Sequence, residues 1–136
     1  MPQLFEEACR TNSSDKVHEF LSGQPPLDVD ITNKKGKTGL MIAAGNGAVD
    51  SLKVLIEKKA NLNATDLDGL TALIYALYTD QYEVVDILVE EKADLELTFE
   101  GQTILHLAAI RGWFSIQFVF LTYKTNIVEN DQLTDI

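Results

Sequence analysis

The apolar residues of this chain recur in pairs of short stretches, each with the three- and four-residue spacing of an amphipathic helix. The pattern is clearest between residues 35 and 67, where one stretch begins after Thr38 and a second begins after Gly47. The apolar positions of the two stretches are Leu40, Ala43, Ala44 and then Val49, Leu52, Leu55, Ile56. Charged residues alternate with the second stretch, so we predict two antiparallel helices that bury one face and expose the other to water.

This pair of stretches returns along the chain with a period of about 33 residues. Thr38 and Thr71 are 33 positions apart, and Thr103 follows 32 positions later. Such a period indicates that each unit is one supersecondary element, which stacks on its neighbours because it cannot bury its hydrophobic face alone. We predict four units, with approximate bounds of 1–34, 35–67, 68–99 and 100–136.

The heads of these units carry a shared motif. They read Thr-Gly-Leu-Met-Ile-Ala-Ala from Thr38, Thr-Ala-Leu-Ile-Tyr-Ala from Thr71 and Thr-Ile-Leu-His-Leu-Ala-Ala from Thr103. The motif and its period resemble the ankyrin repeat family and identify no particular member. The resemblance implies an all-α fold, with one ankyrin-repeat domain over 1–136 whose four helix-turn-helix units stack into a solenoid and are joined by short β-hairpin-like loops. The first unit would be a capping repeat.

Several positions depart from the family pattern. Proline after the head threonine is absent, and the histidine of the motif remains only as His106. Lys59 and Lys92 stand where the family has glycine, and each costs on the order of 1 kcal/mol if its backbone is left-handed. These departures from the family pattern predict modest stability but leave the apolar pattern intact.

Gly23 follows the last apolar residue of the second predicted helix, and we expect it to end that helix in a left-handed conformation.

The fourth unit is irregular. Its second helix would place Trp113 and Phe118 where earlier units have small or charged residues. No polar helix follows, and a solenoid end without a cap exposes apolar surface. We therefore expect the chain to be the N-terminal part of a longer array, or its fourth unit to be covered by the tail or by a partner.

The formal net charge of −10 disfavours nucleic acid as the ligand, because proteins that bind a phosphate backbone carry a basic patch. The acidic excess lies mainly in residues 69–100, which sum to −7. We interpret it as a solvated face, with a site for a basic partner as the alternative. One cysteine, no apolar run of membrane-spanning length and no secretory signal predict an intracellular, cytoplasmic or nuclear, protein without membrane insertion.

Catalytic chemistry is not indicated. Cys9, His18 and His106 are the available nucleophile and base types, and they fall in different units or on different faces. No metal-ligand spacing and no complete phosphate-binding loop occurs, so neither a metal nor a cofactor is predicted. Two minor alternatives are a base-stacking platform at Tyr75, Tyr78 and Tyr82, and hydroxylation of Asn63, which resembles the acceptor of asparaginyl hydroxylases.

The family resemblance implies a partner protein that binds the hairpin tips and the exposed positions of the inner helices. The corresponding residues here are Lys34, Lys35, Lys37 and Asn46; Leu67, Asp68, Leu70, Tyr78 and Thr79; Phe99, Glu100, Gln102, Ile110 and Arg111. Several are large or apolar although folding does not require it, which is typical of interface hot spots. Leu67 and Leu70 could instead pack against the adjacent hairpin.

We therefore predict a non-enzymatic protein-recognition module that is monomeric by itself or part of a longer chain. Its concave face would have a basic first hairpin and a more apolar centre. Two alternatives remain: an N-terminal targeting domain of a larger enzyme, such as an acyltransferase, kinase or ubiquitin ligase subunit, and a structural scaffold or assembly chaperone.

Overall fold

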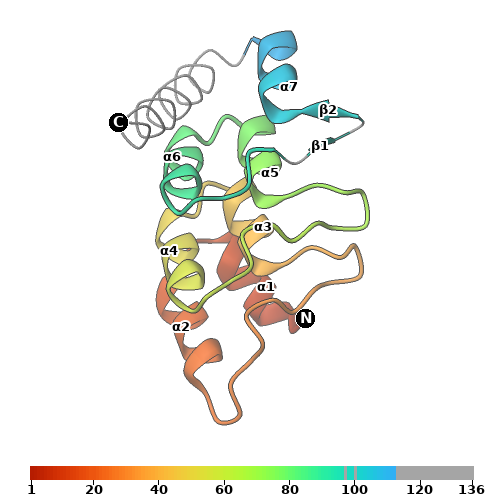
Figure 1. Cartoon of the computed structure of the whole chain (residues 1–136). Coiled ribbons are helices and arrows are strands. Elements are labelled where there is room, and N and C mark those ends of the chain that lie inside the picture. The colour runs from red at the N-terminus through yellow and green to blue at the C-terminus, as the bar shows by residue number, and fades with distance from the viewer. Residues whose placement is uncertain (97, 100, 113–136) are drawn as a thin grey trace, which may run out of the picture. The chain divides into compact units, whose positions relative to one another are not determined.

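The computed structural model describes residues 1–96, 98–99 and 101–112. The chain divides into two compact units, Met1–Asp94 and Leu95–Ile136. Within Met1–Asp94, six helices form three antiparallel pairs (Figure 1). They are α1 (Gln3–Arg10) with α2 (Ser14–Ser22), α3 (Gly39–Gly45) with α4 (Val49–Glu57), and α5 (Ala72–Tyr78) with α6 (Tyr82–Glu90). None of the described helices is long and apolar enough to cross a membrane.

The three pairs stack in chain order. Helix α3 packs between α1 and α5 in an inner row, and α4 packs between α2 and α6 in an outer row (Figure 1). The side chains that fill the space between the rows are fully buried: Phe5, Val17, Leu40, Leu52, Leu55, Ile74, Leu88. Helices of 7–9 residues are too short to be stable alone in water. Their stability therefore comes from neighbouring pairs, as the repeat pattern predicts.

The head threonines cap the inner helices α3 and α5. The backbone N–H of Met41 donates to Thr38 Oγ1 over 3.3 Å, and that of Ile74 donates to Thr71 Oγ1 over the same distance. Gly39, which replaces the family's proline, lies where α3 approaches α1 closely. A Cβ at this position would lie 3.0 Å from the Sγ of Cys9 and 3.2 Å from the Phe5 ring. A larger residue would force these two helices apart.

Left-handed residues end most of the helices. Lys59 and Lys92 have φ of 68° and 66°, as the comparison with glycine-containing repeats suggested. At Lys59 the N–H donates to Ile56 O and the following Ala60 N–H donates to Leu55 O, both over 3.0 Å. This pair of bonds is the Schellman motif, which normally has glycine at the left-handed position.

The expectation for Gly23 was wrong. Its φ of −68° and ψ of 178° are extended, because the chain leaves α2 directly into the segment 24–26 rather than turning back on the helix.

The second compact unit, Leu95–Ile136, begins with a short hairpin. Strand β1 (Thr98–Phe99) pairs antiparallel with β2 (Gln102–Thr103), with Thr98 opposite Thr103. Helix α7 (Ile104–Arg111) follows, and the N–H of His106 donates to Thr103 Oγ1 over 3.2 Å. The third head threonine thus caps its helix like the first two. The features expected of the end of the fourth unit, including Trp113 and Phe118, lie outside the described residues.

Candidate functional site

Within the compact unit Met1–Asp94, two hairpin loops are each closed by one side chain. Asn33 Oδ1 accepts the N–H groups of Lys35 and Lys37 over 2.9 and 3.0 Å. Asp66, 33 positions later, accepts the N–H groups of Asp68 and Leu70, both over 2.9 Å. A side chain that bonds its own following backbone in this way fixes a tight turn. Both loops therefore present their next residues in the same conformation.

The loops lie side by side and are bonded to one another. The N–H of Leu67 donates to Lys35 O over 3.2 Å. Nearer the outer helices, the N–H of Asn61 donates to Asp30 Oδ1 over 2.9 Å, and Asn63 Oδ1 accepts the N–H of Asp94 over 2.8 Å. These bonds make each loop a support for the next, so the tips form one continuous edge.

A cleft of about 570 Å³ lies between the first hairpin and the inner helices. Its walls are α1, through Glu6 and Arg10, and the hairpin tip, through three lysines; its floor is α3, and α5 closes it. The residues that line it are Met1, Glu6, Arg10, Asn33, Lys34, Lys35, Lys37, Met41, Ile42, Gly45, Asn46, Tyr75 and Thr79. The volume lies within the range of ligand pockets in proteins.

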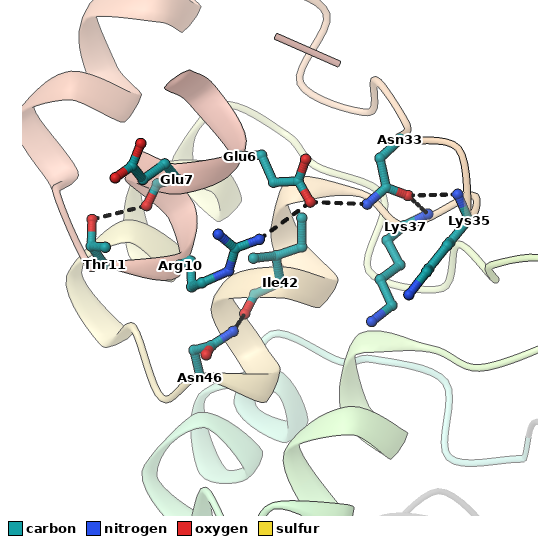
Figure 2. Close-up of polar contacts among 9 residues, drawn as sticks. All are labelled: Glu6, Glu7, Arg10, Thr11, Asn33, Lys35, Lys37, Ile42 and Asn46. Carbon is teal, nitrogen blue, oxygen red and sulfur yellow. Dashed lines mark hydrogen bonds and ion pairs between the residues drawn. The ribbon is translucent and has the colours of Figure 1, made fainter. Parts of the chain in front are cut away.

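A polar network fixes the α1 side of this cleft (Figure 2). Arg10 Nη2 donates to Glu6 Oε1 over 3.3 Å, and Asn33 Nδ2 donates to the same oxygen over 3.2 Å. Because Asn33 also holds the N–H groups of Lys35 and Lys37, the network joins α1 to the hairpin. The loop lysines are therefore displayed from a backbone that two elements hold in place.

The α5 side is held by Tyr75. Its hydroxyl donates to Asp66 Oδ2, and the Lys37 ammonium lies 4.7 Å from the centre of its ring. A cation over an aromatic face is attracted by the ring's quadrupole. Burial, the hydrogen bond to Asp66 and the nearby negative charge of Asp66 and Asp68 raise the pKa of Tyr75 above its ordinary value.

Asp66 stays ionised in this arrangement. Burial opposes the charged form, but the bonds from the Tyr75 hydroxyl and from the N–H groups of Leu70 and Asp68, with the positive charge of Lys37, outweigh it. The net effect lowers the pKa of Asp66 below its usual range.

The cleft brings together five of the residues predicted to bind a partner: Lys34, Lys35, Lys37, Asn46 and Thr79. Leu67 and Asp68 lie on the second tip, where the Leu67 side chain is 78% exposed although a Cβ on Gly36 would lie 3.1 Å from its Cγ. Leu67 therefore touches the preceding hairpin without being buried by it, and Leu70 is half-buried.

The remaining predicted residues lie elsewhere. Tyr78, at the end of α5, is 38% exposed and does not line the cleft. In the compact unit Leu95–Ile136, Gln102 is half-buried and Ile110 is 62% exposed. Glu100 and the side chains of Phe99 and Arg111 lie outside the described residues.

Two of the candidate catalytic residues, Cys9 and His18, lie on different helices of Met1–Asp94. Cys9 is fully buried, and burial, with the charge of Glu6, raises the pKa of its thiol to about 12. A thiol with so high a pKa is a packing group rather than a nucleophile. His18 lies on α2, where its Nε2 is 3.4 Å from the hydroxyl of Ser22. Among the described residues, no cluster of three histidine, cysteine or acidic side chains is arranged to hold a metal ion.

Comparison with known proteins identifies the class. Residues 5–99 match the family model for ankyrin repeats in three copies, and the chain belongs to this family. Together with the stacked helix pairs, the match makes the protein an all-α ankyrin-repeat solenoid. Ankyrin repeats are protein-interaction modules, so the chain belongs to a class whose ligands are proteins.

No curated protein matches the chain significantly. Among solved structures, a chain of the complex between the Bd0816 predatory endopeptidase from Bdellovibrio bacteriovorus and the immunity protein Bd3460 matches with a TM-score of 0.77 and 28% identity. The match covers 91% of this chain and 65% of that chain, so this chain spans about two thirds of that length.

Sequence reasoning missed Glu6, Arg10, Asn33 and Asp66, and it gave Tyr75 only as part of a base-stacking platform. Asn33 and Asp66 carried a usable signal, because each stands three residues before a glycine and five before a head threonine, 33 positions apart. The contacts of Tyr75 with Asp66 and Lys37 left no signal in the sequence. They join neighbouring repeats, and only the folded structure shows which residues of neighbouring repeats meet.

Proposed function

We propose that this chain is a non-catalytic module that binds a partner protein through its hairpin tips and inner helices. The observation that carries the proposal is the cleft itself, where α1, the first hairpin, α3 and α5 converge. Lys34, Lys35 and Asn46 are exposed there on a backbone that the Glu6–Asn33 network fixes. Folding does not require such residues, and a preorganised surface loses less entropy on binding.

Exposed apolar side chains outside the cleft, on the second hairpin tip and at the end of α5, support the proposal too. Leu67 is 78% and Tyr78 is 38% exposed. Aromatic side chains are enriched among interface hot spots, and the fixed ring of Tyr75 would serve as one without reordering.

Absence of catalysis is part of the proposal. The described part of the chain offers Cys9 only as a buried thiol with a raised pKa, and His18 on a different helix. A buried thiol with a raised pKa is not available as a nucleophile, and the His18 ring contacts the Ser22 hydroxyl. The buried, unpaired Cys9 also supports a reducing, intracellular location.

The test is affinity capture from an extract of the native cell with the full chain as bait. Leu67→Ala with Tyr78→Ala removes the proposed apolar contacts. Leu4→Ala is the matched control, because Leu4 is 69% exposed and lines a different depression, with α2. We expect the double variant to capture at least about tenfold less partner protein than the natural chain, since hot-spot truncations cost ~2 kcal/mol or more of binding free energy. Equal capture by all three proteins would refute the proposed face.

A second candidate function follows from the structural likeness. We take the matched chain to be the immunity protein of that complex, since the shared architecture is an ankyrin solenoid. By that likeness, the present chain would bind an enzyme and block it. Copurification with an active hydrolase whose activity falls on adding this chain would support it, and an unchanged rate at saturating chain would reject it.

Two further roles are compatible with the same face. A targeting domain of a larger enzyme predicts an enzymatic domain in the same gene product. A scaffold or assembly chaperone predicts a long-lived stoichiometric complex with a client subunit. The length of the gene product and the dissociation rate of the complex separate them from each other and from an inhibitor.

A further inference from the structure

The cleft is strongly basic although the chain is strongly acidic. Its lining has three lysines and Arg10 against the single carboxylate of Glu6, in a chain of formal net charge −10. Within residues 1–94, Lys34 and Lys35 form no ion pair, and Arg10 is paired only with Glu6. Unpaired like charges gathered in one cleft raise the local concentration of groups with the opposite sign.

We propose, on the basis of the protein-binding function above, that the partner inserts an extended acidic segment into this cleft. The carboxylates would pair with Lys34 and Lys35 on the hairpin, and the segment would run across α3 toward Tyr75. The charges are placed for this because Asn33 holds the backbone of Lys35 and Lys37 against α1.

The remaining groups of the cleft favour a peptide over a phosphate-rich ligand. The Asn46 amide donates through Nδ2 to Ile42 O over 2.7 Å, which leaves Oδ1 to accept a peptide N–H. Phosphate oxygens offer no such donor. Glu6 and the ionised Asp66 beside Tyr75 would repel a continuous row of phosphates, whereas a peptide can place its carboxylates away from them.

Open space beside Tyr75 completes the match to a peptide. Met41 and Ile42 of α3 line the cleft but are themselves nearly covered, and Gly45 opens space in front of Tyr75. A Cβ at Gly45 would lie 3.6 Å from the Cβ of Tyr75. The absence of a side chain at Gly45 therefore leaves room for a side chain of the bound segment against the edge of the ring.

The test uses fluorescence anisotropy with the full chain and a short labelled peptide of alternating glutamate and serine. Controls are the same peptide with glutamine for glutamate, the same peptide with lysine, and inorganic pyrophosphate as competitor. We expect the glutamate peptide to bind and the other two peptides to bind at least about tenfold more weakly, because two or more charge pairs are lost.

Two matched charge reversals locate the site. Lys34→Glu with Lys35→Glu should weaken the glutamate peptide about tenfold. Lys16→Glu with Lys53→Glu changes the net charge equally at exposed positions on α2 and α4 and should change binding by less than about twofold. Glu6→Gln removes the one carboxylate of the lining while it keeps an oxygen for Asn33, and should strengthen binding by about twofold. A gain cannot arise from misfolding.

Equal weakening by both reversals would overturn the inference, as would glutamine-peptide binding equal to that of the glutamate peptide. Absence of any peptide binding would do so too, and complete displacement by pyrophosphate at equal concentration would assign the cleft to phosphate instead. The outcome is separable from the proposed function: if partner capture depends on Leu67 and Tyr78 but not on the lysines, the module stands and the acidic segment falls.

Discussion

Replacing Lys59 by glycine should stabilise the protein, although it removes a charged side chain and adds backbone freedom. Lys59 has φ of 68° at the left-handed position of the Schellman motif that ends α4. Its side chain is exposed, and it forms no ion pair among the described residues. The substitution therefore removes the backbone strain and takes away no contact within that part of the chain.

The magnitude follows from two opposing effects. A left-handed conformation costs a non-glycine residue roughly 1–2 kcal/mol. Glycine gains about 0.5–1 kcal/mol of freedom in the unfolded chain, which offsets part of this. The net stabilisation is about 0.7 kcal/mol. Lys92, with φ of 66° at the equivalent place after α6, should give the same gain, and because the two positions are in separate repeats the gains should add to ~1.4 kcal/mol.

The assay is urea unfolding followed by circular dichroism, with thermal unfolding in parallel. The double glycine variant should raise Tm by about 5 °C in a domain of this size. Lys59→Ala loses the same charge without relieving φ and should change stability by less than about 0.3 kcal/mol, while Lys53→Gly in the interior of α4 should cost ~1 kcal/mol. If Lys59→Gly destabilises the protein as Lys53→Gly does, the reasoning from φ is refuted.

Three other substitutions probe different contacts within the compact unit Met1–Asp94. Leu55→Ala, at a fully buried position of α4, should cost ~2–5 kcal/mol in urea unfolding through the cavity it leaves; a loss below 1 kcal/mol would mean that the helix rows collapse around the gap. Thr38→Val keeps the shape of the side chain but removes the oxygen that accepts the Met41 N–H, so the urea midpoint should report a loss of ~1 kcal/mol. Because the folded pKa of Asp66 is lowered from 3.8, its ionisation stabilises the fold above that pH, and this contribution disappears as pH falls through the folded pKa. The urea midpoint of the natural chain should therefore fall more steeply below about pH 4 than that of Asp66→Asn, and parallel curves would contradict this.

The repeat architecture was predictable because its determinants are local and recur. The apolar faces and the head threonines recur in each unit, and Thr38, Thr71 and Thr103 each cap a helix. The left-handed backbone at Lys59 was predictable for the same reason, since aligned units share one backbone. Gly23 misled because a glycine after a helix permits a left-handed turn but does not require one.

The site was predictable only in part. The pattern pointed to Lys34, Lys35 and Lys37 as residues that packing does not require, and the cleft includes all three. It could not reveal that Glu6 and Asn33 join α1 to that loop, because the contact spans 27 residues with no recurring spacing. Tyr75 was grouped with Tyr78 and Tyr82 by helical spacing, yet its partners are Asp66 and Lys37 on two different loops.

The loop closures at Asn33 and Asp66 have a consequence for how such a protein can change. Each turn is specified by a single carbonyl or carboxylate oxygen that accepts two backbone N–H groups. The residues just beyond that oxygen are thereby released from any role in specifying the turn, and the two loops already differ, with lysines on one and Leu67 and Asp68 on the other. Mutation at these tips can therefore change the surface that the loops present while the scaffold beneath stays constant.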